Sequence, residues 1–173
     1  MKNYREIAPE ELNLSAFKLI GKDWMLITAK DETKQSRASC MTASWGGLGV
    51  LWNLPVATVY IRPQRYTYSL AENTDELSLC FPGEKYRKAL GFCGKYSGKD
   101  MDKITDCGLC SAEVDGVPVI DDSEVIMICK KIYADDLKEN KFIDKEHLSH
   151  YNGDFHRFYI LEIKKILVKE QET

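Results

Sequence analysis

The chain has 173 residues, of which 24 are basic and 27 acidic, and its formal net charge is −3. This near balance excludes a global field that would attract nucleic acid or an anionic membrane surface. Hydrophobic residues make up 44% and charged residues 29%, which is typical of folded globular proteins rather than disordered or membrane-spanning ones. We expect a single domain covering residues 1–173, because this length suffices for one buried core and is short for two.

The first residues, MKNYREIAPEELNL, are polar and mixed in charge. They lack the apolar stretch of a signal peptide, and apolar runs such as 125–129 are too short to cross a bilayer. We therefore expect a cytoplasmic protein that does not associate with membranes. Six cysteines in such a chain are expected to be reduced thiols rather than a disulfide framework.

Segments that predict strands dominate the first half of the chain. Four of them are short and rich in β-branched or aromatic residues: 24–29, 38–45, 55–61 and 77–81. Between them we expect two short helices. One covers 64–73, and the other covers 84–93, where apolar residues follow a helical stripe and Gly94 is expected as the C-terminal cap.

The second half predicts more strands. Asp115 and Gly116 lie between two apolar alternations within 112–119, which is a tight hairpin signal. Segments 125–133 and 155–168 predict long strands buried on both faces, and a polar loop covers 138–152. Strands and helices do not alternate regularly, so we expect a mainly β fold, a closed antiparallel barrel decorated by short helices.

The stretch MTASWGGLGV at 41–50 allows two interpretations. It is not a dinucleotide fingerprint, because Pro55 blocks the helix that would have to follow the glycines. One interpretation is a glycine-rich turn that leaves a strand. The other is a strand end whose backbone amides and the Thr42 and Ser44 hydroxyls bind a polar ring system, with Trp45 packed against it. That combination suits a flavin.

A second candidate site is the stretch YIRPQRYTYSLAEN at 60–73. Arg62 and Arg65 bracket Pro63 at the start of a predicted helix, where guanidinium groups and unpaired amides pointing the same way would bind a phosphate. The alternative is a pair of solvated surface arginines. The glycine- and lysine-rich segment 91–104 either closes over a phosphate or ring edge, or is only a connector.

The cysteines and histidines also leave alternatives open. Cys107 and Cys110 have C-x-x-C spacing, which allows a structural zinc or dithiol role that Cys80 or Cys93 could join, but no second C-x-x-C completes a zinc set. Ordinary reduced thiols are the alternative, since three cysteines stand at apolar positions that we expect to be buried: Cys80, Cys93 and Cys129. The histidine pair His147 and His150 could ligate a metal, but no further ligand is evident. We predict no metal site. His156, which opens the last predicted strand, is a candidate substrate contact.

Three stretches of the sequence match a known family pattern: MTASWGGLGVLWNLPVATVYIRPQRYT at 41–67, YRKALGFCGKYSGKDMDKI at 86–104 and HRFYILEIKKILV at 156–168. With them the chain resembles the flavin reductase-like, flavoredoxin type of FMN-binding split-barrel proteins. The resemblance covers most of the chain from residue 24 onward. It implies a Greek-key antiparallel split barrel that forms a homodimer and holds FMN noncovalently near the subunit interface.

The resemblance also assigns residues to the cofactor. It implies that five residues line the isoalloxazine ring and the ribityl chain: Met41, Thr42, Ala43, Ser44 and Trp45. A second group would hold the phosphate and the ring edge: Arg62, Pro63, Arg65, Tyr66 and Thr67. Ser97 and Gly98 would complete the pocket.

The implied function is an oxidoreductase that passes electrons from NAD(P)H, bound transiently, through FMN to free flavin or to a protein acceptor. No catalytic residue is predicted, because the cofactor carries the chemistry. The alternative is a flavoredoxin-type carrier that exchanges electrons with a redox protein partner and lacks significant NAD(P)H activity. A third alternative is a zinc or dithiol protein built on Cys107 and Cys110.

Overall fold

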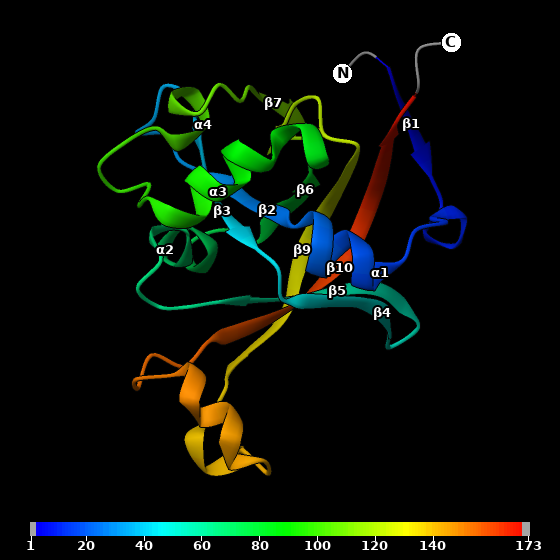
Figure 1. Cartoon of the computed structure of the whole chain (residues 1–173). Coiled ribbons are helices and arrows are strands. Elements are labelled where there is room, and N and C mark those ends of the chain that lie inside the picture. The colour runs from blue at the N-terminus through cyan, green and yellow to red at the C-terminus, as the bar shows by residue number, and fades with distance from the viewer. Residues whose placement is uncertain (1–2, 171–173) are drawn as a thin grey trace.

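An eight-stranded antiparallel sheet forms the frame of the chain in the computed structural model, which describes residues 3–170 (Figure 1). Along the sheet the strand order is β3-β2-β6-β9-β10-β5-β4, and β1 pairs with the second half of β10. The strands are β1 Tyr4–Ile7, β2 Met25–Lys30, β3 Ala38–Ala43, β4 Gly46–Leu51, β5 Leu54–Ile61, β6 Glu76–Phe81, β9 Val125–Asp136 and β10 Arg157–Lys169. A separate hairpin consists of β7 Ser111–Val114 and β8 Val117–Ile120.

Short helices connect the strands. The α-helices are α1 Ala16–Lys18, α2 Tyr66–Glu72, α3 Arg87–Lys95 and α4 Lys103–Asp106. The remaining helical turns are η1 Pro9–Glu11, η2 Leu19–Asp23, η3 Glu84–Tyr86, η4 Glu139–Lys141 and η5 Lys145–His150. The last two occupy the segment that the sequence predicted as a polar loop. Within residues 3–170, no helix is long and apolar enough to cross a membrane.

The sheet curls into a split barrel, as the resemblance implied, rather than the closed barrel that the strand pattern alone predicted. Its end strands are β3 and β4, and within residues 3–170 no ladder joins them. The chain passes from one end strand to the other through Ser44 and Trp45 alone. After this link β4 pairs back onto β5, from Gly46 opposite Val59 to Leu51 opposite Leu54, and this hairpin carries β4 away from β3. The result is an open seam between β3 and β4.

Strand β4 corrects the interpretation of 46–51 as a turn. The real turn is Trp52–Asn53, where both residues have positive φ angles of 52° and 59°, as a tight hairpin requires. The glycines hid the strand because they have low strand propensity. A close approach explains one of them, since a Cβ on Gly46 would lie 2.6 Å from the Thr58 carbonyl oxygen.

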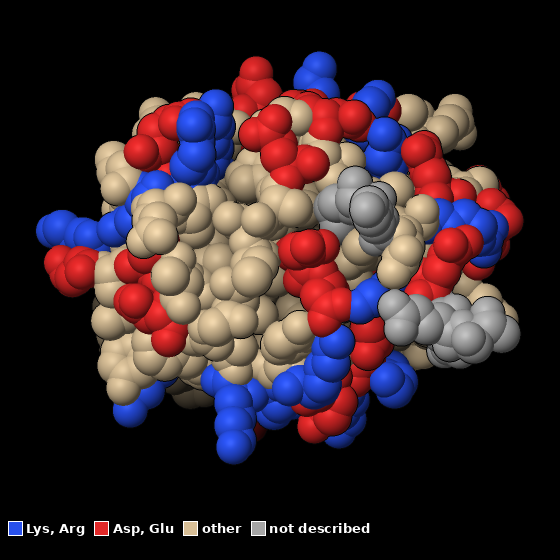
Figure 2. Space-filling view, turned by 90° about the horizontal axis from the view of Figure 1, so that it is seen from above, with Lys and Arg blue, Asp and Glu red and all other residues tan. Residues whose placement is uncertain are grey.

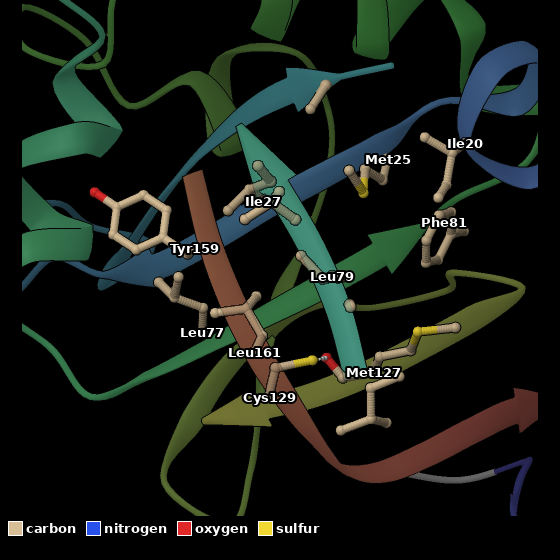
Figure 3. Packing of buried hydrophobic residues seen from close by; sticks show 14 of the residues in the cluster. Ile20, Met25, Ile27, Leu77, Leu79, Phe81, Met127, Cys129, Tyr159 and Leu161 are labelled. Atoms are coloured by element: carbon tan, nitrogen blue, oxygen red, sulfur yellow. Dashed lines mark hydrogen bonds between the residues drawn. The ribbon is translucent and has the colours of Figure 1, made fainter. Parts of the chain in front are cut away.

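Each face of the sheet has its own apolar core. The inner core lies inside the curl and includes Ile27, Leu79 and Leu161 (Figure 3). The outer core lies between the sheet and a layer made of α3, α4 and the β7–β8 hairpin, and it includes Leu26 and Leu90. Neighbouring residues of a strand point to opposite faces, so β2 contributes to both cores. This outer layer brings α3 and α4 against β3.

The structure corrects two expectations for helix α3, namely its first residue and its C-terminal cap. The helix begins at Arg87 and continues to Lys95, so Gly94 is inside it and does not cap it. The cap residue is Tyr96, which has extended backbone. Gly94 instead allows close packing on β3, because a Cβ placed there would lie 3.5 Å from Cβ of Thr42.

The predicted hairpin at Asp115 and Gly116 is confirmed, with positive φ angles at both residues.

The two long strands are not buried on both faces along their whole length. In β9 only residues 125–129 are fully buried, and from Lys130 onward its residues are half-buried or exposed. Strand β10 alternates between buried and half-buried positions through most of its length. The reason is that the β7–β8 hairpin covers only the first part of β9, so the rest of this pair has solvent on its outer side.

Charges of both signs are distributed over the surface. On the face shown in Figure 2, lysines and arginines alternate with acidic residues around the rim, and uncharged residues occupy the middle. Surface ion pairs such as Lys85 with Asp122 and Arg37 with Glu32 mix the two signs further. The face in Figure 2 therefore has no broad basic area of the kind that binds nucleic acid.

Candidate functional site

A pocket lies at the end of β3, beside the open seam. Six residues line it: Thr42, Ala43, Ser44, Trp45, Tyr60 and His156. Its volume is about 170 Å³. Five of the six were among the predicted site residues, and they come from two stretches more than a hundred residues apart in sequence. We call this the aromatic pocket.

Aromatic rings surround Trp45, whose side chain is 46% exposed. The His156 ring lies 5.2 Å from the Trp45 ring and the His150 ring lies 5.9 Å from it, both measured between centroids. Tyr60 contacts His156 edge-on at 6.4 Å. The pocket therefore offers flat and edge-on aromatic surfaces to a ring system.

His156 is held as a neutral imidazole. Its Nδ1 lies 3.0 Å from the Tyr151 hydroxyl, and the residue is only 7% exposed. Burial, followed by the positive charge of Arg62, lowers the pKa of His156 from 6.5 to about 4. A neutral ring packs beside Trp45 without bringing a charge into the pocket.

The alternation of β3 decides what its residues can offer to a ligand. Met41 and Ala43 point into the inner core, so they are available to a ligand mainly through their backbone. Thr42 points the other way, and its hydroxyl donates a hydrogen bond to the Leu90 carbonyl at 2.6 Å. Toward a ligand that hydroxyl has only lone pairs left, so it acts as an acceptor.

The two arginines of the predicted phosphate site bond different partners. Arg62 forms a salt bridge with Asp154 and donates to the His150 carbonyl at 2.8 Å. Arg65 donates to the Gly94 carbonyl at 2.9 Å and to the Cys93 carbonyl at 3.3 Å. The expectation that both guanidinium groups point the same way is therefore wrong. A carboxylate attracts Arg62, whereas the carbonyls at the C-terminal end of α3 attract Arg65.

A second cluster surrounds Gly98, and we call it the cationic cluster. It consists of Ser39, Arg65, Tyr66, Gly98 and Lys103. A Cβ on Gly98 would lie 2.5 Å from Oγ of Ser39 and 3.0 Å from Cδ1 of Tyr66, so only glycine fits there. Lys103 is 4% exposed and donates to the Cys93 carbonyl at 2.9 Å. Thr42 links this cluster to the aromatic pocket, because it lines the pocket and packs on Gly94.

The cations of this cluster lack carboxylate partners. Within residues 3–170, the hydrogen bonds of Arg65 and Lys103 go to backbone carbonyls, and neither side chain forms a salt bridge. Burial lowers the pKa of both groups. Lys103 is buried and Arg65 is half-buried, and a cation removed from water is costly unless an anion compensates its charge, so the pair suits an anionic group such as a phosphate.

The structure does not bring every predicted residue to the pocket. Pro63 is exposed, and Ser97 is exposed with its hydroxyl accepting from the Lys99 amide at 3.2 Å. Thr67 is 1% exposed within α2. None of these three lines the aromatic pocket. Tyr66 reaches the cationic cluster, and its hydroxyl donates to Asp31 at 3.0 Å.

Sequence reasoning missed three residues that the structure places at the site. Tyr60 lines the aromatic pocket, and Ser39 and Lys103 belong to the cationic cluster. The alternation along the strand at 55–61 could have indicated Tyr60, because it predicts which side chains point away from the inner core. Lys103 stood in the glycine- and lysine-rich segment, but nothing in the sequence separated it from its exposed neighbours.

The thiols and histidines form no metal-binding group. Within residues 3–170, no set of three or more histidine, cysteine, aspartate or glutamate side chains is arranged to hold a metal ion. His147 and His150 stack at 6.1 Å in the exposed η5 turn. The predicted burial of three cysteines is confirmed for Cys80, Cys93 and Cys129. Cys110 is exposed and Cys107 is partly buried.

The fold defines the class of protein. Solved FMN-binding split-barrel proteins match nearly the whole chain, which confirms the predicted mainly β fold. An FMN-binding domain of a flavin reductases-like enzyme from Shewanella baltica OS155 matches with a TM-score of 0.68 at 16% identity, over 96% of this chain and 78% of that one. The flavoredoxin of Desulfovibrio vulgaris (Miyazaki F) matches with a TM-score of 0.67 at 21% identity, also over 96% of this chain and 78% of that one. The styrene monooxygenase flavin reductase from Pseudomonas putida S12 gives 0.61 at 13% identity, over 83% and 77%.

The sequence itself shows the family. The model of the flavin reductase like domain matches residues 18–173, so the chain belongs to the flavin reductase-like domain family. This confirms the resemblance found in the sequence. No curated protein matches the chain.

The residues present fit FMN. The test is the chemistry of the donor set: a flavin needs a flat apolar surface for its rings and positive charge for its phosphate. Trp45 supplies the first, and Arg65 and Lys103 supply the second on the other side of Thr42.

Proposed function

We propose that the chain binds FMN noncovalently and is an NAD(P)H:flavin oxidoreductase. The observation that carries the proposal is the pairing of two clusters in a member of this family. The aromatic pocket adjoins a cationic cluster whose two cations, Arg65 and Lys103, bond within the described residues 3–170 to backbone carbonyls. When bound, FMN supplies the hydride-accepting and electron-transferring chemistry.

Three residues would hold the cofactor in complementary ways. Arg65 and Lys103 would hold its phosphate, and Trp45 would give its ring system an apolar wall. The hydroxyl of Thr42 is already committed as a donor to Leu90, so it would accept a hydrogen bond from the cofactor. The backbone of Met41 and Ala43 would supply the remaining contacts along β3.

His156 would contact a second substrate. It lines the aromatic pocket, and its neutral ring donates or accepts according to the tautomer that Tyr151 selects. A nicotinamide nucleotide that binds transiently would meet this ring. Its electrons would pass to free flavin or to a protein acceptor.

A flavoredoxin-type carrier is the second candidate function. The observation that favours it is the crowding around Trp45, because the His150 and His156 rings both pack on it and narrow the space available to a nicotinamide. Two flavoredoxins are also among the matching structures, from Desulfovibrio vulgaris and Methanosarcina acetivorans. Such a carrier would receive electrons from a redox protein.

We also propose that the chain acts as a homodimer. The aromatic pocket of one chain holds only about 170 Å³, less than the roughly 300–1,000 Å³ of pockets that enclose small molecules. Exposed apolar residues lie along the edge strand β4 and its turn, with Val50 77% and Trp52 60% exposed. Replacing Val50 with aspartate should turn a dimer into a monomer in light scattering, and a wild type that is already monomeric would contradict this part of the proposal.

Titration with FMN tests the binding proposal. Apoprotein should quench FMN fluorescence to saturation at one FMN per chain. Anaerobic stopped-flow mixing of the holoprotein with NADH or NADPH then separates the two functions. Reduction as fast as turnover with free flavin supports the reductase. If NADH and NADPH reduce the holoprotein far more slowly than a reduced redox protein does, the result favours the carrier. A protein that does not take up FMN would contradict both functions.

A further inference from the structure

Three cysteines from separate elements lie in a row beside the cationic cluster. Cys40 is on β3, Cys93 is on α3 and Cys107 follows the last residue of α4. The Sγ atoms of Cys40 and Cys93 are 3.7 Å apart, and those of Cys93 and Cys107 are 3.8 Å apart. All three thiols are free. The contact of α3 and α4 with each other and with β3 produces this row (Figure 1).

The cysteines differ in how solvent reaches them. Cys40 and Cys93 are completely buried, whereas Cys107 is only partly buried. A small oxidant therefore reaches Cys107 first, and the nearest thiol that can react next is Cys93. A disulfide requires the two sulfur atoms to approach to about 2.05 Å, and side-chain rotation with a small helix shift covers the remaining gap.

We propose that Cys93 and Cys107 form a reversible disulfide when a peroxide oxidises the protein. In the first step the Cys107 thiol reduces one molecule of hydrogen peroxide, and the products are Cys107 sulfenic acid and water. In the second step Cys93 sulfur attacks the sulfenic sulfur, the S–S bond forms and a second water leaves with the Cys93 proton. Two electrons and two protons from a dithiol reductant reverse the reaction.

This disulfide would close a loop that contains two of the five residues of the cationic cluster. The segment between the two cysteines carries Gly98 and Lys103, and Lys103 donates to the carbonyl of Cys93 itself. Pulling the end of α3 toward the end of α4 has to move this segment. Gly98 cannot move toward Ser39, because the two residues already pack so closely that a Cβ on Gly98 would not fit. Oxidation should therefore weaken FMN binding several-fold, a consequence that rests on the proposed function.

Raised thiol pKa values make the reaction slow at neutral pH. The hydrogen bond with Cys107 lowers the pKa of Cys93, but the contact with Cys40 and burial outweigh it and raise that pKa to about 12. The contact with Cys93, followed by burial, raises the pKa of Cys107. Because the thiolate is the reactive form, the rate of oxidation should increase with pH up to the alkaline range. The device thus responds to sustained rather than brief oxidation.

The experiment maps the disulfide directly. Apoprotein is treated with hydrogen peroxide, alkylated, digested and examined by mass spectrometry. We expect a peptide that links Cys93 to Cys107, a loss of about 2 Da from the intact chain, and recovery of both thiols with dithiothreitol. A link between Cys40 and Cys93, a link between Cys107 and Cys110, or no link at all would overturn the proposal.

A matched pair of variants separates the switch from the flavin site. Cys107→Ser should prevent the link, and Cys110→Ser, which changes an exposed thiol three residues away, should leave it intact. FMN titrations before and after oxidation then measure the effect on binding. If the disulfide-linked protein keeps its FMN affinity, the disulfide itself is supported, but the proposed effect of the disulfide on FMN binding is contradicted. If reduced protein does not bind FMN, only the proposed function fails, since the peptide map does not depend on it.

Discussion

The aromatic pocket and the cationic cluster lie on either side of Thr42 but are built differently. At the pocket, His156 pairs with Tyr151, and Arg62, which contributes to the low pKa of His156, pairs with Asp154. In the cluster, the hydrogen bonds that Arg65 and Lys103 make with the described part of the chain go to backbone carbonyls. A region whose charges are already paired gains little from a ligand, whereas a region whose buried and half-buried cations bond to carbonyls gains much from an anion. We therefore expect most of the binding free energy to come from the cluster, and access of the second substrate to depend on the pocket.

The largest expected effect separates the two arginines. Arg65→Gln should weaken FMN binding about 10–100-fold, because a hydrogen bond to a charged group contributes about 1.5–3 kcal/mol. Arg62→Gln is the matched control, and it should change the affinity little because Arg62 is engaged by Asp154. Fluorescence titration measures both, and chemical unfolding checks that Arg65→Gln is folded. If Arg62→Gln has the larger effect, the phosphate lies on the other side of Thr42.

The next effect concerns the tightest contact of the cluster. Gly98→Ala should lower the free energy of unfolding by about 1–2 kcal/mol, because the new methyl group would overlap Ser39. Gly49→Ala is the control, since a Cβ at Gly49 meets nothing within 4 Å. Denaturant titration compares the two. Adding Ser39→Ala to Gly98→Ala should restore part of the loss, and equal effects of the two glycine variants would contradict the close approach.

A pH effect of similar size belongs to the pocket. The pKa of His156 is 6.5 when unperturbed and about 4 in the folded protein, so between these values the unfolded chain binds more protons. Stability contributed by neutral His156 is complete above pH 6.5 and is lost as the pH falls toward 4. From pH 7 to 5 the loss should be about 1–2 kcal/mol. His156→Gln should flatten this dependence in denaturant titrations, and an unchanged slope would mean that His156 titrates normally.

The smallest effect tests the aromatic wall. Trp45→Leu should weaken FMN binding by about 0.5–1.5 kcal/mol, the range of an aromatic pair. Trp52→Leu is the matched control, because Trp52 is also exposed but lies at the β4–β5 turn, away from the pocket. Isothermal titration calorimetry measures both. A Trp45 effect larger than that of Arg65 would reverse the comparison between the two regions.

Much of the fold could be predicted because its signals are local. The alternation at 77–81 gave β6, and Asp115–Gly116 gave the β7–β8 turn. Strand β4 could not be predicted, because its glycines removed the alternating pattern. Gly94 was misplaced as a cap because its role is a contact with Thr42 on a distant strand, which no local pattern contains.

The candidate site divides in the same way. The residues of 41–45 lie next to one another in sequence, so a single stretch pointed to the pocket. The partners of Arg62 and Arg65 lie far away along the chain, at Asp154 and at Cys93 and Gly94. Spacing alone placed the arginines side by side, and only tertiary contacts could show that their side chains separate.

The position of β10 in the sheet sets the order in which the molecule can assemble. This strand lies between β9 and β5 and also pairs with β1, so the β4–β5 hairpin has no place in the sheet until β10 has been synthesised. The pairing of Tyr4 with Lys169 is among the most non-local in the chain, and such contacts form slowly. The aromatic pocket takes residues from β3, β5 and the start of β10. A nascent chain therefore has its β2, β3 and β6 strands well before the aromatic pocket is complete, so a ligand that needs the whole pocket can bind there only after β10 has paired.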